Sequence, residues 1–409
     1  MTYIRRHLED LVLRLSASFP AVLITGPRQA GKTTLLRHLA EKEQRNRSYV
    51  TLDDLSERNL AKNDPSLFLQ IHQPPVLIDE VQYAPEIFTS IKLYADEHQQ
   101  PGDFWLTGSQ VFRLMQNVQE SMSGRTALLH LSPLSQHEMA GAECIPFDTE
   151  PENIARMAAG MEKTDVNGIY ERIWTGSMPA VAGNPAPERE IYYASYISTY
   201  IEWDVRDLSG TIDALKFYDF VTAAAARTAQ ILNVHSLAED AGIDEAAARD
   251  WLHILETLGI VFLLHPFSNN VLKRTIKSPK LYFYDTGLVC HLTKWSSPQT
   301  AQSGAMNGAL LENYVVSEIV KGYQNAGKEP HLHYYRDRDA KEIDLILERD
   351  GKLCPVEIKK TASPEKKMTK TFDVIRKSGL PQGTGAVLCM ADRPGAIDRE
   401  TMIIPVWMI

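Results

Sequence analysis

The sequence predicts an α/β chain of several domains, and three observations support this fold class. First, its 409 residues are roughly two to four times the length of a typical domain, so more than one core is expected. Second, short apolar runs alternate with helix-like segments in the first quarter of the chain, which is typical of a parallel sheet with helical crossovers. Third, strand-like runs follow a helix near the C-terminus, which indicates another α/β domain.

Residues 1–140 are expected to form the first domain, which opens with an amphipathic helix and continues with the alternating pattern. The expected elements are a strand at Ala21–Thr25, a helix at Lys32–Lys42, a strand near Tyr49–Leu52, a strand at Pro75–Ile78, a helix at Ala84–Glu97 and a strand at Phe104–Thr107. Residues 141–205 follow as a connector or helical lid, because proline and glycine become more frequent there and no period is clear.

The segment 206–295 has high helical propensity, including an alanine-rich helix at Phe220–Gln230. It continues with a helix, a turn at Gly242, a second helix and a strand at Ile260–Leu264. This order is typical of a winged helix-turn-helix, and a plain helical subdomain that ends in a strand is the alternative. The last domain, 296–409, is expected to contain a helix at Ala309–Gly322 and strands at His331–Tyr335, Glu342–Glu348, Leu353–Lys359 and Gly385–Met390.

Composition limits the functions that the chain can have. It carries 43 basic and 52 acidic residues, a formal charge of -9, which argues against a protein that coats nucleic acid with its whole surface. Any contact with nucleic acid must therefore be local. The scattered cysteines indicate a reducing compartment, and there is no apolar leader and no run of about 18 apolar residues. We therefore expect a cytoplasmic protein that does not contact a membrane.

A phosphate-binding loop is predicted between the first strand and its helix. The segment satisfies G-x-x-x-x-G-K-[ST] at Gly26, Pro27, Arg28, Gln29, Ala30, Gly31, Lys32 and Thr33, and Thr34 follows it. The two glycines let the backbone N–H groups point at phosphate oxygens, and the helix adds its positive dipole end. Lys32 would neutralise the β- and γ-phosphates, and the Thr33 hydroxyl would coordinate magnesium. ATP and Mg²⁺ are the expected cofactors.

Two further strands end in polar residues where a nucleotide would lie. Asp79 and Glu80 follow an apolar run, so Asp79 is expected to hold the magnesium and Glu80 to activate the attacking water. After the next strand, Ser109 is the candidate sensor of the γ-phosphate, with Thr107 as the alternative; either could instead cap a helix. Arg125 is a candidate arginine finger toward a neighbouring subunit, and a surface salt bridge is the alternative.

The C-terminal domain has a D…E-x-K pattern on a predicted hairpin. Glu357 and Lys359 share one face of a strand because the side-chain period is two, and the hairpin could bring Asp344 beside them, near Glu312 of the preceding helix. Asp344 and Glu357 could then bind magnesium, and Lys359 could polarise an attacking water. Exposed acidic strands are the alternative. Local phosphate contacts are expected from basic residues in two groups, with solvated surface charge as the alternative for both: Arg336, Arg338, Lys341, Lys360, Lys366, Lys367 and Lys370, and Lys273, Arg274, Lys277 and Lys280.

These residues together resemble the AAA+ superfamily of P-loop ATPases. More narrowly, GPRQAGKTTL, VLIDEVQ, LTGSQ, LSPLSQHE, SPKLYFYDTGL, EIDLIL and PVEIKK resemble an ATPase family with a C-terminal DUF4143 region. The resemblance covers nearly the entire chain and implies an AAA core, a winged-helix segment and a restriction-endonuclease-like fold similar to the PD-(D/E)xK nucleases. It also implies homo-oligomers, most often hexamers. The function expected is a Mg-dependent ATPase that acts on DNA; the alternative is an ATP-dependent scaffold that recognises a protein partner with a catalytically inactive C-terminal domain.

Overall fold

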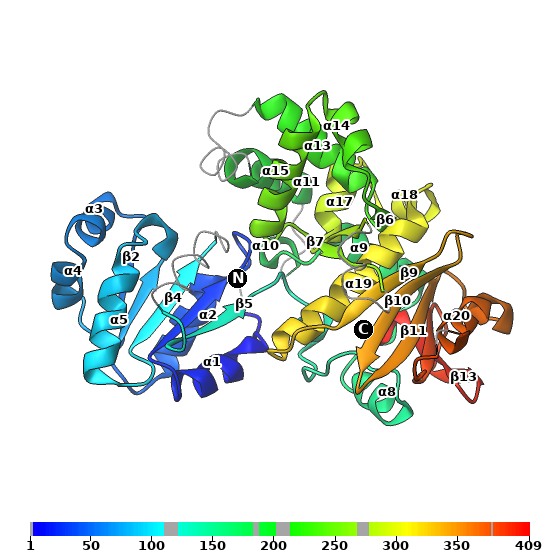
Figure 1. Ribbon diagram of the computed structural model, residues 1–409, viewed down its shortest axis with the longest axis horizontal. Helices are drawn as coiled ribbons and strands as arrows, with labels where there is room; N and C mark the ends of the chain where they lie inside the picture. The colour runs from blue at the N-terminus through cyan, green and yellow to red at the C-terminus, as the bar shows by residue number, and fades with distance from the viewer. Residues whose placement is uncertain (1–2, 110–121, 183–187, 202–212, 268–277, 378) are drawn as a thin grey trace.

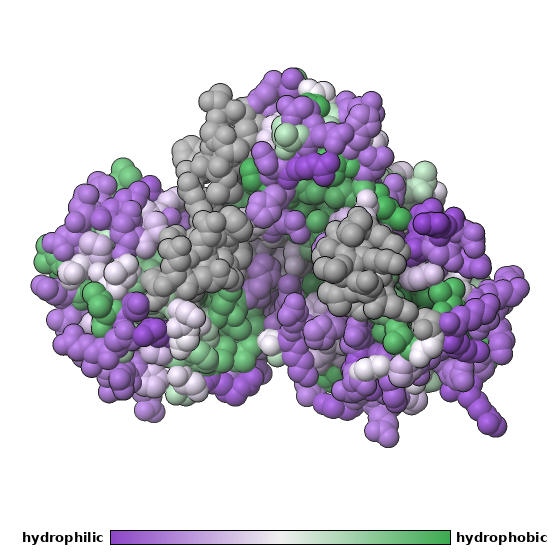
Figure 2. Space-filling view, viewed as in Figure 1, coloured by the Kyte–Doolittle hydropathy of each residue, from purple (hydrophilic) through white to green (hydrophobic). Residues whose placement is uncertain are grey.

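The computed structural model describes residues 3–109, 122–182, 188–201, 213–267, 278–377 and 379–409. Three parts follow one another along the chain: a parallel-sheet domain, a mainly helical middle part and a C-terminal mixed sheet (Figure 1). Polar side chains cover most of the face in view, and apolar ones gather in smaller patches (Figure 2). Among the described residues, no helix has the length and apolarity needed to cross a membrane.

The first domain is a five-stranded sheet in the order β2-β3-β4-β1-β5, with every neighbouring pair parallel. Its elements are α1 (Leu8–Ser16), β1 (Ala21–Thr25), α2 (Lys32–Lys42), β2 (Ser48–Thr51), α3 (Leu55–Asn63), α4 (Pro65–Ile71), β3 (Val76–Asp79), η1 (Val81–Tyr83), α5 (Ile87–His98), β4 (Phe104–Gly108), β5 (Thr126–His130) and α7 (Gln136–Ala140). Alternate residues of β1 pack on opposite faces, Leu23 toward α3, α4 and α5 and Ile24 toward α1 and α2. The central strands β1, β3 and β4 are thus buried on both sides, as is typical of parallel sheets.

Sequence reasoning predicts four of the five strands of this sheet and misses β5, the strand at one of its two edges. The bounds predicted for β1 and α2 are confirmed, and β2, β3, β4 and α5 lie within a few residues of their predicted positions. The edge strand β5 was not predicted, because its side chains alternate between buried and partly exposed and form no continuous apolar run. The helices α3 and α4 were also missed.

The middle part is more helical at its start than predicted. Its elements are α8 (Pro151–Met157), α9 (Val166–Thr175), α10 (Pro179–Ala182), α11 (Arg189–Ser195), η2 (Tyr196–Ile201), α13 (Ala214–Ala226), β6 (Gln230–Ile231), α14 (Val234–Ala241), α15 (Glu245–Thr257), β7 (Val261–Leu264) and β8 (Lys280–Phe283). The helix expected to run to Gln230 ends at Ala226, since Ala229 has a φ of 60° and Gln230 begins a strand. The predicted helix, Gly242 turn, helix and strand are present, followed by a three-stranded antiparallel sheet in the order β6-β8-β7.

The C-terminal domain packs a long helix against a six-stranded mixed sheet in the order β13-β14-β12-β11-β10-β9. After α17 (Thr286–Leu292), which packs on the helices of the middle part, its elements are α18 (Pro298–Ser303), α19 (Asn307–Asn325), β9 (Leu332–Arg336), β10 (Glu342–Arg349), β11 (Lys352–Lys359), η3 (Lys366–Phe372), α20 (Asp373–Lys377), β12 (Gly385–Cys389), β13 (Gly395–Asp398), β14 (Thr401–Pro405) and η4 (Val406–Met408). The helix and strands predicted here are confirmed, and β13 and β14 add to them. One apolar core joins this domain to the middle part, so the two fold against each other.

Candidate functional site

The glycine-rich loop connects β1 to α2 at the carboxyl edge of the parallel sheet. Gly26 has a φ of 141°, and a Cβ atom added there would lie 2.2 Å from the carbonyl oxygen of Leu131, so no larger residue fits. Gly31, with a φ of 95°, precedes the first residue of α2. The buried Lys32 Nζ donates to the carbonyl oxygens of Gly26 and Pro27, each at 3.0 Å. The ammonium group therefore points back into the loop that would enclose the phosphates.

Asp79 is held at the end of β3 by hydroxyl groups from three other elements. Its Oδ1 accepts hydrogen bonds from Thr33 Oγ1 at 2.8 Å and from Thr107 Oγ1, and its Oδ2 accepts one from Tyr49 OH at 3.1 Å. A hydroxyl and a carboxylate in contact are a donor set that suits Mg²⁺, which takes few protein ligands and keeps several waters. Thr33 and Asp79 thus fit the predicted magnesium position, and Tyr49 is a member of the site that sequence reasoning missed.

Glu80, Gln82 and Ser109 form one hydrogen-bonded group beside Asp79. Glu80 has a φ of 57°, an uncommon conformation for a glutamate, and its N–H donates to Thr107 Oγ1 at 3.1 Å. Gln82 Nε2 donates to Glu80 Oε2 at 2.5 Å and to the buried Ser109 Oγ at 3.1 Å. The structure thus brings the candidate base Glu80 and the candidate sensor Ser109 together through Gln82, and places Thr107 against Asp79.

Arg125 lies away from the phosphate loop of its own chain. Its carbonyl oxygen accepts the N–H of Ala21, the first residue of β1, whereas the loop follows the last residue of that strand. Its partly exposed guanidinium forms an ion pair with Asp96, with Nη2 3.0 Å from Oδ2. Within one chain the residue is therefore a surface ion pair. At this position Arg125 does not reach the nucleotide site of its own chain. Its action on the nucleotide of a neighbouring subunit stays a prediction.

The buried Arg6 holds the phosphate loop in place through a hydrogen bond to the loop residue Ala30. Sequence reasoning did not predict this role. Arg6 donates from Nη1 to the carbonyl oxygen of Ala30 at 2.7 Å, from Nη2 to that of Ser132 at 2.7 Å, and from Nε to Glu138 at 2.9 Å. Glu138 also accepts the N–H groups of His7 and Ser135. Burial alone would raise the pKa of Glu138, but Arg6 and these hydrogen bonds lower it.

The same junction reaches the C-terminal domain. The last turns of α19 contact it through Gln324, which accepts a hydrogen bond from Ser132 Oγ, and through Asn325, whose Nδ2 donates to Ser135 Oγ at 3.3 Å. Near the same end of α19, Glu318 Oε2 accepts the N–H of Gln136 at 2.8 Å. The motif LSPLSQHE is therefore a structural junction between the ATP loop and the helix on which Glu312 lies.

The predicted carboxylate group of the C-terminal domain is brought together at one end of β10 and β11. Lys359 Nζ lies 3.2 Å from Asp344 Oδ2 and 2.8 Å from Glu357 Oε1, and Asp344 Oδ2 also accepts the N–H of Ile358 at 2.8 Å. Glu357 is 7% exposed, and its Oε2 is buried with no hydrogen-bond partner among the described residues. We call Glu312, Glu342, Asp344, Glu357 and the two lysines that contact them, Lys280 and Lys359, the carboxylate cluster.

Burial and mutual repulsion raise the pKa values of two carboxyl groups in the carboxylate cluster. Burial and the neighbouring Asp344 raise the pKa of Glu357 to about 8, although Lys359 lowers it in part. Burial also raises the pKa of Glu312, opposed by Lys280. Among the described residues, no three His, Cys, Asp or Glu side chains stand close enough together to hold a metal ion. The predicted metal ligands Asp344 and Glu357 thus lie together, and one oxygen of Glu357 is buried without a hydrogen-bond partner among the described residues.

The expected basic surface is only partly present. The prediction that Lys280 contacts phosphate is wrong, because this side chain is 2% exposed and lies between Glu312 and Glu342. Lys273, Arg274 and Lys277 lie outside the described residues. Arg336 forms an ion pair with Glu342, Lys366 with Asp398 and Lys367 with Glu365, while these basic side chains stay largely exposed.

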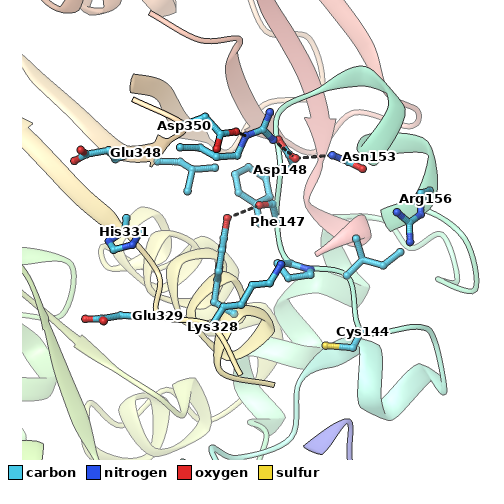
Figure 3. A pocket seen from close by; sticks show the side chains of 15 residues that line it. Cys144, Phe147, Asp148, Asn153, Arg156, Lys328, Glu329, His331, Glu348 and Asp350 are labelled. Atoms are coloured by element: carbon cyan, nitrogen blue, oxygen red, sulfur yellow. Dashed lines mark hydrogen bonds and ion pairs between the residues drawn. The ribbon is translucent and has the colours of Figure 1, made fainter. Parts of the chain in front are cut away.

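A cavity of about 790 Å³ lies elsewhere, between the connector on one side and the end of α19, the loop before β9 and the end of β10 on the other (Figure 3). Acidic and basic side chains both line it, and Arg349 is already paired with Asp148. The cavity contains none of the predicted site residues.

The parallel sheet, the phosphate loop and the Asp79-Glu80 pair define a P-loop ATPase domain of the AAA type. In agreement, residues 18–140 match the family model described as an AAA domain. Residues 167–299 match a domain of unknown function, DUF8612, and residues 307–409 match another, DUF4143. The AAA domain implies nucleotide binding, and its Walker-type motifs suggest ATP hydrolysis.

Two uncharacterized proteins, one from Mycobacterium tuberculosis and one from Mycobacterium bovis, are each 28% identical to this chain over 348 residues. The matched region covers 84% of this chain and 71% of each relative. Among solved structures, a Walker-type ATPase of Pyrococcus abyssi is similar with 16% identity and a TM-score of 0.44, over 71% of this chain and 96% of that one. The RuvB Holliday junction branch migration motor of Thermotoga maritima is similar with 18% identity and a TM-score of 0.31, over 66% and 91%.

Proposed function

We propose that the protein is a Mg-dependent ATPase that acts on DNA, with a metal-dependent phosphodiester hydrolase in its C-terminal domain. The observation that carries the DNA part is the contact of Asp344, Glu357 and Lys359 beside Glu312. Two carboxylates can hold a divalent cation that polarises the phosphate, and an ammonium group can stabilise the charge that develops in the transition state. The helix order at Val234–Thr257 and the antiparallel sheet after it support a winged-helix assignment for the middle part.

At the ATP site, each residue has a role that follows from its position. Lys32 would turn from the loop carbonyls to the β- and γ-phosphates, while Thr33 and Asp79 share the magnesium shell. Glu80 is the group that would take the proton of the attacking water, and Ser109 would report the γ-phosphate to it through Gln82. Magnesium would supply charge neutralisation at the phosphates.

A DNA-cleavage assay of the full chain with Mg²⁺ or Mn²⁺ tests the proposal. Asp344→Ala or Glu357→Ala should eliminate cleavage and leave ATP hydrolysis intact, because each removes a cation ligand far from the phosphate loop. Lys359→Ala should slow cleavage about a hundredfold, the effect typical of one electrostatic donor. Lys352→Ala, at the exposed opposite end of β11, is the matched control and should cleave at the parental rate.

A second candidate function is an ATP-dependent scaffold that recognises a protein partner. The formal charge of -9 and the lysines that already neutralise the carboxylate cluster favour it. Binding of single-stranded, duplex or branched DNA without cleavage in either metal would support the scaffold over the hydrolase. Affinity that does not fall with salt would argue against phosphate contacts altogether.

A further inference from the structure

The carboxylate cluster contains a lysine that the C-terminal domain does not supply. Lys280 is the first residue of β8 in the middle part, and its Nζ lies 2.8 Å from Glu312 Oε1 and 2.6 Å from Glu342 Oε1. Its side chain is 2% exposed, so the ion pairs are shielded from water. Tyr282, two residues along the same strand, donates to Glu312 Oε1 at 2.7 Å. The middle part thus contributes two side chains to one face of the cluster.

The position of β8 is fixed by a residue adjacent to Glu312. Asn313 is fully buried; its Oδ1 accepts the N–H of Phe283, and its Nδ2 donates to the carbonyl oxygen of the same residue, each at 2.8 Å. Thr228 also donates to Asn313 Oδ1. These bonds attach the end of β8 to α19 in a single register. Because Glu312 and Asn313 are consecutive on that helix, Lys280 is held in place relative to the carboxylates before any ligand binds.

The two lysines divide the cluster into two cation positions. Lys280 lies between Glu312 and Glu342, where its ammonium group occupies the point at which those carboxylates would share a cation. Lys359 contacts Asp344 and Glu357 and is 37% exposed, and the Oε2 of Glu357 has no partner among the described residues. An exposed lysine can move aside, whereas one that is buried and doubly paired cannot do so without leaving two carboxylates uncompensated.

We propose that Lys280 is a built-in cation that restricts the carboxylate cluster to one divalent metal ion, held by Asp344 and Glu357. Lys280 contacts both Glu312 and Glu342, which leaves Asp344 and Glu357 as the carboxyl groups available to a metal ion, and the exposed Arg336 contacts Glu342 Oε2. Lys280 acts through Glu312 and Glu342 and is therefore a positioning residue. The proposal rests on the metal-dependent function proposed above and specifies the number of ions at that site.

Counting bound Mn²⁺ by electron paramagnetic resonance on the nucleotide-free full chain tests this proposal. All proteins would carry Asp79→Asn, so that the ATP site contributes no ion. The parent should bind one Mn²⁺ in the cluster, and Asp344→Asn with Glu357→Gln should abolish that binding. Lys280→Met should bind two, because Glu312 and Glu342 then become available. Lys280→Arg, which keeps the charge, and the exposed Lys352→Met should each bind one.

One ion in Lys280→Met, or none or two in the parent, would overturn the inference. If Lys280→Met fails to fold, Lys280→Gln replaces it, with two ions expected again and one ion contradicting the proposal. DNA cleavage by the same parent separates this inference from the proposed function. If the parent binds one ion and Lys280→Met binds two, but the parent does not cleave DNA, only the proposed hydrolase activity is contradicted. If the parent cleaves DNA and both proteins bind one ion, only the proposed role of Lys280 is contradicted.

Discussion

At the scale of single residues, the ATP site separates binding of the nucleotide from its hydrolysis. Lys32 is the cation that would contact the phosphates, so Lys32→Ala should abolish ATP binding. Glu80 forms hydrogen bonds with Gln82 and Thr107 at the end of β3, where it would act on the attacking water, so Glu80→Gln should bind ATP normally and hydrolyse it at least a hundredfold more slowly. Equilibrium binding and single-turnover hydrolysis measure the two steps. Parental hydrolysis by Glu80→Gln would show that another group is the base.

His130 should make the stability of the protein depend on pH. Its Nε2 is buried without a hydrogen-bond partner among the described residues, and burial together with the charge of Lys32 lowers its pKa to about 4. The unfolded chain, with a histidine pKa near 6.5, binds a proton that the folded protein excludes as the pH falls. The free energy of unfolding is therefore unaffected by His130 above about pH 6.5. As the pH falls from there to about 4, His130 lowers this free energy by up to about 3 kcal/mol.

Urea unfolding at about pH 7 and about pH 5 measures this effect. His130→Gln should reduce the difference in unfolding free energy between the two pH values, while the exposed His265→Gln should leave it unchanged. An unaltered difference in His130→Gln would assign the pH dependence to other groups.

The residues that could be predicted are those whose chemistry is local in the sequence. Lys32 and Thr33 belong to a contiguous motif, and the D…E-x-K group lies on adjacent strands whose pairing follows from a short turn. Arg6 and Lys280 could not be predicted, because the first contacts Glu138 at a separation of 132 residues and the second contacts Glu312 from another part of the fold. A basic residue in a sequence gives no sign that its partner lies in a distant element.

At the scale of elements, the segment before α1 is attached to the phosphate loop by the buried pair of Arg6 and Glu138. Both side chains are at most 4% exposed, so Arg6→Met would leave Glu138 charged and uncompensated and should destabilise the protein by about 3 kcal/mol. The double variant Arg6→Met with Glu138→Gln should lose less than the sum of the two single variants. Denaturant unfolding measures all three, and Arg5→Met, which removes an exposed pair with Asp10, is the matched control. Additive losses would mean that the two residues act independently.

Element boundaries were predictable where the apolar pattern is continuous and not where tertiary contacts decide them. The strand β1 is buried at every position, so its pattern is unambiguous. The sheet edge β5 is partly exposed, and the residues around Ala229 leave the helical conformation although their helical propensity is high. In both cases the neighbouring elements, which the local sequence does not reveal, determine the structure.

At the scale of the whole molecule, the ATP site and the carboxylate cluster are joined by one helix. α19 carries Glu312 in its first half and contacts the junction beside the phosphate loop through Gln324 and Asn325 at its end. The parallel-sheet domain and the C-terminal domain are therefore in direct contact through α19. Within one chain, Arg125 lies at the amino ends of the strands, and the phosphate loop lies at their carboxyl ends. Any action of Arg125 on a nucleotide therefore requires assembly of several chains.

We expect ATP to promote homo-oligomers in which Arg125 acts on the nucleotide of the neighbouring subunit. Arg125→Ala and Lys32→Ala should each be inactive alone, the first for lack of the finger and the second for lack of bound nucleotide. When the two variants are mixed, hydrolysis should recover in part at interfaces where an intact loop meets an intact arginine. Asp96→Ala, which frees Arg125 from its ion pair, should retain activity and serves as the control. Steady-state hydrolysis on oligomers shown to be mixed measures the recovery, and its absence would leave Arg125 as a surface ion pair.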